Sequence, residues 1–107
     1  MLKIKYSLEA YKDLKSLKKY LSSNWGENKS KKIIKKIASD IRSLEKFPKS
    51  GAKLSKIIGF DTDYRYLFTE KNYVFYYLDK EIINIVRIIN EKQDFINKLF
   101  WYIIRYK

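Results

Sequence analysis

The sequence predicts an α+β fold, with an N-terminal strand, an antiparallel helical hairpin packed on a small antiparallel β-sheet, and a C-terminal helix. Three observations carry this prediction: a short alternating segment at the start, two segments with helical spacing of apolar residues, and three later runs rich in β-branched and aromatic residues. The chain has 107 residues, so we expect residues 1–107 to form a single domain.

The first element is a strand that leads into a helix. Leu2, Ile4 and Tyr6 are separated by lysines, which is typical of a strand with one solvated face. Ser7 then suits a helix N-cap, because its hydroxyl can accept a hydrogen bond from the first turn. Apolar residues at spacings of four, three and four predict a helix over about 8–24. They are Ala10, Leu14, Leu17 and Leu21.

A second helix is expected after Gly26, which ends the first. The same helical spacing returns and stops near Phe47 and Pro48, because proline cannot continue a helix. Its apolar positions are Ile33 or Ile34, Ile37, Ile41 and Leu44. Two helices joined by so few residues form an antiparallel hairpin.

The sheet is predicted from the second half of the chain. Residues 48–59 contain the only proline and two of the three glycines, which predicts an irregular segment. Strand-forming runs follow at 64–69, 73–78 and 82–89, and the short turns between them predict an antiparallel meander. The last run is apolar at nearly every position apart from Arg87, so we expect it inside the sheet and covered on both faces.

The chain ends in an apolar segment that predicts a helix over about 92–105. Its longest apolar run, 99–104, is far shorter than the ~20 residues of a membrane span. The start of the chain does not read as a signal peptide either. We therefore expect a cytoplasmic protein that makes no contact with a membrane.

The charge narrows the possible functions. The net charge is +12, of which residues 1–60 carry +11 (16 basic, 5 acidic) and residues 61–107 carry +1 (8 basic, 7 acidic). A one-sided basic surface indicates a polyanion or an acidic protein as partner. The absence of Cys and His excludes thiolate nucleophiles, Ser-His-Asp triads and His-based metal sites, and we expect no metal and no cofactor.

Five motifs, in register with the predicted elements, resemble the RelE/ParE superfamily of toxins from bacterial type II toxin–antitoxin modules. The resemblance covers about residues 2–100. The motifs are Tyr6-Ser-Leu-Glu-Ala10 with Asp13, Leu14 and Leu17; Leu44-Glu-Lys-Phe-Pro-Lys-Ser-Gly51; Tyr64-Arg-Tyr-Leu67; Tyr73-Val-Phe-Tyr76; and the segment 85–95, from Ile85 through Arg87 to Phe95.

The resemblance implies a growth-arresting protein that a cognate antitoxin, expected to be acidic, holds inactive. The RelE-like branch cuts messenger RNA in the ribosome, whereas the ParE-like branch poisons DNA gyrase, and a shared fold does not choose between them. Many RNase members carry Arg where Val74 stands, and His or Arg where Asn90 and Glu91 stand. These departures favour gyrase as the target. The alternatives are a ribosome-dependent endoribonuclease and a degenerate member that binds only its antitoxin.

Arg65 and Arg87 match positions where Arg is common in the superfamily, so they are the candidate catalytic residues if the chain is a nuclease. For Arg65 the structural alternative is pairing with Asp61 or Asp63. Arg87, inside an apolar strand, must either be paired or line a groove, and the sequence favours the groove.

The remaining candidates are lysines and tyrosines. Lys46, Lys49, Lys53 and Lys56 could follow a phosphate backbone, although a solvated loop would look the same. Further lysines make the hairpin basic and able to attract nucleic acid or an acidic antitoxin segment. They are Lys12, Lys15, Lys18, Lys19, Lys29, Lys31, Lys32, Lys35 and Lys36. Tyr102 and Tyr106 lie where RelE-like nucleases often place a catalytic tyrosine, but the apolar run around them favours packing against the sheet or a partner.

Overall fold

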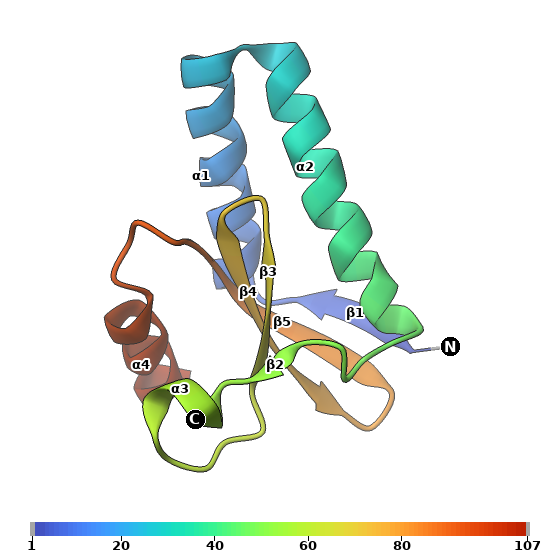
Figure 1. The fold of residues 1–107 in the computed structure, drawn as a ribbon, viewed down its shortest axis with the longest axis vertical. Helices are drawn as coiled ribbons and strands as arrows, with labels where there is room; N and C mark the ends of the chain where they lie inside the picture. Colours follow the sequence, from blue (N-terminus) through green and yellow to red (C-terminus); the bar gives the residue numbers. More distant parts are fainter. Residues whose placement is uncertain (1, 107) are drawn as a thin grey trace.

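The computed structural model describes residues 2–106, and it describes the side chains of all of these except residues 95, 100 and 103–106. The predicted order of elements is confirmed, with three short additions (Figure 1). The strands are β1 (Lys3–Tyr6), β2 (Ala52–Lys53), β3 (Arg65–Thr69), β4 (Asn72–Asp79) and β5 (Ile82–Asn90). The helices are α1 (Leu8–Trp25), α2 (Glu27–Arg42), the 3₁₀ turn η1 (Ser43–Glu45), α3 (Ser55–Ile58) and α4 (Phe95–Tyr106).

The five strands form one sheet in the order β1-β5-β4-β3-β2. Strands β3, β4 and β5 make the predicted antiparallel meander. β1 instead pairs with β5 in parallel, with Ile4 opposite Ile83. The sheet is therefore mixed, because alternation along β1 fixes which side chains share a face but not the direction of the strand. β5 lies between β1 and β4, inside the sheet as predicted.

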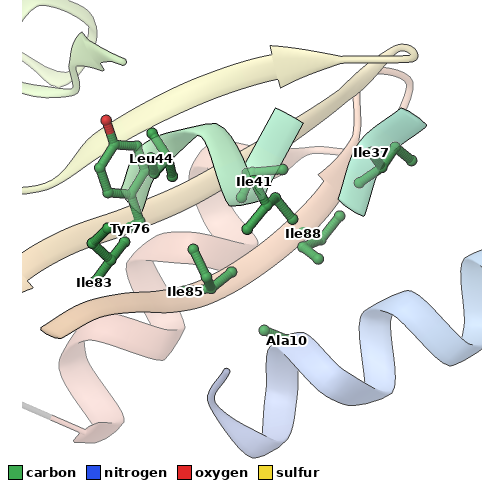
Figure 2. Packing of buried hydrophobic residues seen from close by; sticks show 9 residues of the cluster. Ala10, Ile37, Ile41, Leu44, Tyr76, Ile83, Ile85 and Ile88 are labelled. Carbon is green, nitrogen blue, oxygen red and sulfur yellow. The ribbon is translucent and has the colours of Figure 1, made fainter. Parts of the chain in front are cut away.

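Helices cover both faces of this sheet. On one face the hairpin of α1 and α2 packs on the strands, and the side chains interdigitate (Figure 2). On the other face Leu54 and Leu99 contact Phe75, Val86 and Ile89. β5 contributes to both clusters, so its nearly continuous apolar sequence is explained by burial on two sides. The hairpin-side cluster consists of Ala10, Ile37, Ile41, Leu44, Val74, Tyr76, Ile83, Ile85 and Ile88.

Ser7 is the predicted N-cap of α1. It has extended backbone angles, and its hydroxyl oxygen accepts a hydrogen bond from the backbone N–H of Ala10 at 3.0 Å. The same hydroxyl donates to the carbonyl oxygen of Val86 in β5 at 2.8 Å. One side chain therefore begins the helix and also attaches it to the sheet.

Residues 48–59 are more regular than the sequence predicted. They contain β2, in which Ala52 and Lys53 pair with Tyr66 and Arg65, and the single-turn helix α3. Leu54 joins these two elements and is fully buried. A two-residue strand and a four-residue helix are too short to show a hydrophobic period, which is why the sequence indicated only an irregular segment.

The second and the last helices differ from prediction at their ends. α2 begins at Glu27, directly after Gly26 as predicted, but its α-helical part ends at Arg42, and the 3₁₀ turn η1 continues only to Glu45, short of the predicted end near Phe47. α4 begins at Phe95, because the carboxylate of Asp94 accepts a hydrogen bond from the N–H of Asn97 at 3.3 Å and so caps the first turn. No helix in the described part of the chain is both long and apolar enough to span a bilayer.

Candidate target-binding surface

Arg87 is paired. Its Nε lies 2.8 Å from Oδ2 of Asp13 in α1, and its Nη2 lies 3.0 Å from Oδ1. Each side chain is 16% exposed. The hydrogen bond to Asp13 raises the pKa of the Arg87 guanidinium, against the opposing effect of burial. Of the two alternatives for Arg87, the structure shows the ion pair and not the favoured groove.

This ion pair belongs to a wider contact between α1 and the edge of β5. β1 stops at Tyr6, so the later part of β5 has no neighbouring strand on that side. There the carboxylate of Asp13 accepts a hydrogen bond from the backbone N–H of Ile88 at 2.9 Å. The hydroxyl of Ser7 donates a hydrogen bond to the carbonyl oxygen of Val86. Side chains of the helix therefore replace the missing strand, which satisfies backbone groups that would otherwise be unpaired.

Arg65 holds a loop in place. Its Nη1 donates to the carbonyl oxygens of Gly51 at 2.8 Å and of Lys49 at 3.3 Å. Among the residues that the structure describes, Arg65 forms no ion pair, so the expected alternative with Asp61 or Asp63 is not observed. The guanidinium instead binds the backbone of residues 49–51, in the segment that carries the loop lysines.

Tyr76 supports the same loop from below. Its ring is fully buried, and its hydroxyl accepts the N–H of Gly51 at 3.0 Å and donates to the carbonyl of Pro48 at 2.9 Å. Burial raises the pKa of Tyr76, while the Gly51 N–H and the charge of Arg65 oppose the rise. A Cβ at Gly51 would meet the Tyr76 hydroxyl and lie 2.8 Å from the carbonyl oxygen of Tyr66, so only glycine fits.

The resulting surface, here called the basic loop, comprises residues 46–56. Lys46, Lys49, Lys53 and Lys56 are all exposed, and Lys53 pairs in register with Arg65. None of the four lysines is in an ion pair within the described part of the chain. Phe47 stands among them with 64% of its surface exposed. Unneutralised cations beside an exposed ring can bind a phosphate backbone or an acidic protein segment.

The other candidate residues do not join this surface. Tyr102 packs with the buried cluster on one face of the sheet, whereas Tyr76 belongs to the cluster on the other face. Tyr76 is the cross-strand neighbour of Arg65. The side chain of Tyr106 lies outside the described residues. Arg65 and Arg87 are on strands separated by β4, about 10 Å apart at the usual strand spacing. Among the side chains that the structure describes, Arg87 and Tyr102 interact electrostatically, whereas Arg65 stands on β3, with β4 between it and Arg87.

Sequence reasoning missed three residues of the basic loop and its support. The sequence places Tyr76 in a strand, Gly51 in an irregular segment and Phe47 at the end of a helix, and all three in the family motifs, but it indicates no role for their side chains or their contacts. The signal for Gly51 was its position in an otherwise lysine-rich loop. Its close approach to Tyr76 joins positions 25 apart in the chain, which no local pattern can show.

The sequence matches the family described as the ParE toxin of the type II toxin–antitoxin system parDE over residues 4–95. The chain therefore belongs to this family and is a type II toxin of the RelE/ParE superfamily. This confirms the resemblance noted from the five motifs. No curated protein is significantly similar in sequence.

Two solved structures show the same fold. The chromosomal ParDE toxin–antitoxin system from P. aeruginosa has a chain with a TM-score of 0.71 and 21% identity, over 84% of this chain and 96% of that one. The YoeB–YefM complex from Staphylococcus aureus has a chain with a TM-score of 0.51 and 24% identity, over 83% of this chain and 95% of that one. The predicted α+β architecture is confirmed by these likenesses.

Proposed function

We propose that this toxin arrests bacterial growth by binding DNA gyrase through the basic loop. The observation that carries the proposal is the use of both candidate arginines in holding the fold: Arg87 is bound by Asp13, and Arg65 is bound to loop carbonyls. A binding mechanism needs no free catalytic cation or base, whereas cleavage of RNA needs both. The rigid support of the loop by Tyr76 favours recognition of a target as well.

We further propose that a cognate antitoxin of acidic character neutralises the chain. The solved structures with this fold are described as toxin–antitoxin complexes, and the chain carries a net charge of +12. An acidic partner would be attracted to that charge at long range. Co-expression with the neighbouring reading frame should restore growth and co-purify a complex; growth arrest that persists in its presence would exclude that frame as the antitoxin.

Induced expression followed by pulse labelling tests the choice of target. A gyrase poison stops DNA synthesis before protein synthesis, whereas a nuclease stops protein synthesis first and shortens messages. The combined variant Lys46→Glu, Lys49→Glu and Lys53→Glu should lose the arrest. The control, Lys92→Glu with Lys98→Glu, changes exposed lysines outside residues 46–56 and should retain the arrest. Early loss of translation with message cleavage would replace the proposal with the RelE-like alternative.

A further inference from the structure

The end of the helical hairpin away from the sheet is a second basic and aromatic surface, separate from the basic loop. We call it the hairpin tip and define it as Trp25, Gly26 and Lys29. Figure 1 shows this turn between α1 and α2 at the far end of the hairpin, beyond the strands. Leu21 is buried there but belongs to neither core cluster, so the tip packs on itself and not on the sheet.

The tip is rigidly built. Ser30 is fully buried between the helices, where its hydroxyl accepts a hydrogen bond from Ser22 Oγ at 3.2 Å and donates to the carbonyl of Lys18 at 3.3 Å. Gly26 makes the turn in a single residue with φ of 87°, a conformation that favours glycine. Small residues and a one-residue turn bring the helices close together. The backbone positions that carry Trp25 and Lys29 are therefore fixed relative to each other.

Trp25, the last residue of α1, is exposed at this turn. Its surface is 58% exposed, and the Nζ of Lys29 stands 4.5 Å from the centroid of its ring. Further lysines and a second aromatic ring lie on the same side of α1 as Trp25. Tyr11, Lys15 and Lys18 lie about 20° to 80° from Trp25 around the helix, at 100° per residue. Lys15 stands 5.7 Å from the centroid of Tyr11, repeating the pairing at the tip.

The charged residues at the tip and along the adjoining parts of α1 and α2 are almost all basic. Residues 14–39 contain eight lysines and a single acidic residue, Glu27. In the described structure only Lys36 of these eight is in an ion pair, with Asp40. The core uses none of these cations, and the two rings stand about 21 Å apart along α1 at 1.5 Å per residue. Aromatic rings and lysines without an ion pair therefore alternate along one side of the hairpin. A single-stranded nucleic acid, with its phosphates and its bases, could contact both kinds of side chain.

We propose that the hairpin tip binds single-stranded DNA, with an unpaired base stacked on Trp25 and phosphates contacting Lys29 and the lysines of α1. A flat exposed ring stacks on a base only when the base is unpaired, so the ring favours a single strand over a duplex. An acidic peptide would satisfy the lysines but would leave the indole without a stacking partner. DNA is chosen over RNA because gyrase acts on DNA, and this choice alone rests on the proposed function.

Fluorescence of the purified full chain tests the proposal. Trp101 is 68% exposed, so Trp101→Phe should fold normally and leave Trp25 as the only indole. Titration with oligo(dT) of about 15 nucleotides, within the usual site sizes of ~4–16, should quench this fluorescence. Rising salt should weaken binding with a log–log slope of about −0.7 per phosphate contacted. Trp25→Ala, followed by anisotropy of labelled DNA, should weaken binding about tenfold or more.

Matched variants separate the tip from general charge. Lys29→Glu should weaken binding, whereas Lys80→Glu in the β4–β5 turn should not. Tyr20→Ala removes an equally exposed ring on another side of α1 and should have no effect. Glu27→Gln should strengthen binding by removing the one acidic residue near the tip.

Three results would overturn the proposal: unchanged affinity of Trp25→Ala, equal affinity for duplex DNA, or quenching by poly-glutamate as strong as by oligo(dT). Oligo(rU) bound more than about tenfold tighter than oligo(dT) would overturn the choice of DNA. None of these assays contains gyrase. Failure of the tip proposal and failure of the gyrase proposal can therefore be told apart.

Discussion

Arg87 and Asp13, 74 positions apart in the chain, form a two-pronged ion pair that joins β5 to α1. The same carboxylate also accepts the N–H of Ile88. This pair explains how a charged residue stands inside a nearly continuous apolar strand. It also gives α1 a fixed position over the open edge of β5, from which the hairpin extends.

Asp13→Ala should destabilise the fold by about 3 kcal/mol, at the lower end for a buried pair because both side chains keep some exposure to water. The change leaves the guanidinium and the Ile88 N–H without a partner. Urea unfolding measures the loss, with Asp63→Ala as the control at an exposed carboxylate. A loss below about 1 kcal/mol, the range of surface pairs, would show that the pair does not hold the helix.

Tyr76→Phe should lower the free energy of unfolding by about 1–3 kcal/mol, because the buried N–H of Gly51 and the carbonyl of Pro48 lose their shared hydrogen-bond partner. The basic loop should also be cut faster by trypsin after Lys49 and Lys53. Tyr20→Phe alters an exposed hydroxyl and serves as the control for both measurements. Unchanged proteolysis of the Tyr76 variant would mean that the hydroxyl does not fix the loop.

Gly51→Ala should destabilise the chain by about 1–3 kcal/mol through overpacking, because the added methyl meets the Tyr76 hydroxyl and the Tyr66 carbonyl. Thermal unfolding is the measurement, and Ser50→Ala at the exposed neighbouring position is the control. Combined with Tyr76→Phe, the effects should be less than additive, since the second change removes the oxygen that the methyl meets. Full additivity would place the strain elsewhere.

The turn between β3 and β4 is strained and can be improved. Glu70 and Lys71 have φ of 47° and 66°, in the left-handed region that both residues disfavour. Replacing them by Asn and Gly, the pair that a two-residue hairpin turn prefers, should stabilise the fold by about 1 kcal/mol or more. The melting temperature should therefore rise. A lower one would show that the acidic or basic side chain makes a contact worth more than the relief of strain.

Asp40 should make stability depend on pH in the acid range. Burial acts to raise the pKa of this carboxyl, but hydrogen bonds from Lys36 and Thr69 outweigh it and hold the pKa below its usual value. The unfolded chain, with a carboxyl pKa of about 4, binds the proton first as pH falls. The stabilisation is therefore full above about pH 5 and is lost as pH falls through the folded pKa.

Comparing the unfolding of the native chain and Asp40→Asn across this range tests the pH dependence. The native chain should be the more stable at pH 7, because Asp40 links α2 to β3 through Thr69 at 2.6 Å. The difference should shrink as the pH falls to about 3. A difference that stays constant with pH would contradict the assigned cause.

Local patterns predicted most of the fold. Ser7 was recognised as an N-cap because its partner is three residues away, and β5 was placed inside the sheet because its own sequence is apolar on both sides. The parallel pairing of β1 could not be predicted, since alternation is the same in both directions. α3 and β2 were missed because one turn and two residues show no period.

The candidate site was less accessible to sequence reasoning. The partners of Arg65 and Arg87 lie 14 and 74 positions away, so no spacing rule connects them. Lysines were identified correctly as exposed, but their support by Tyr76 depends on a buried hydroxyl in another strand. Contacts of this kind arise from packing of distant segments and become visible only in the folded chain.

Purified gyrase and supercoiled DNA show whether the basic loop directs this toxin to gyrase. The native chain should produce covalent gyrase–DNA cleavage complexes that are trapped as linear DNA. The Lys46→Glu, Lys49→Glu, Lys53→Glu variant should produce none, while the Lys92→Glu, Lys98→Glu control should act like the native chain. Absence of cleavage complexes with the folded native chain, or equal activity of the loop variant, would show that the basic loop does not direct the chain to gyrase.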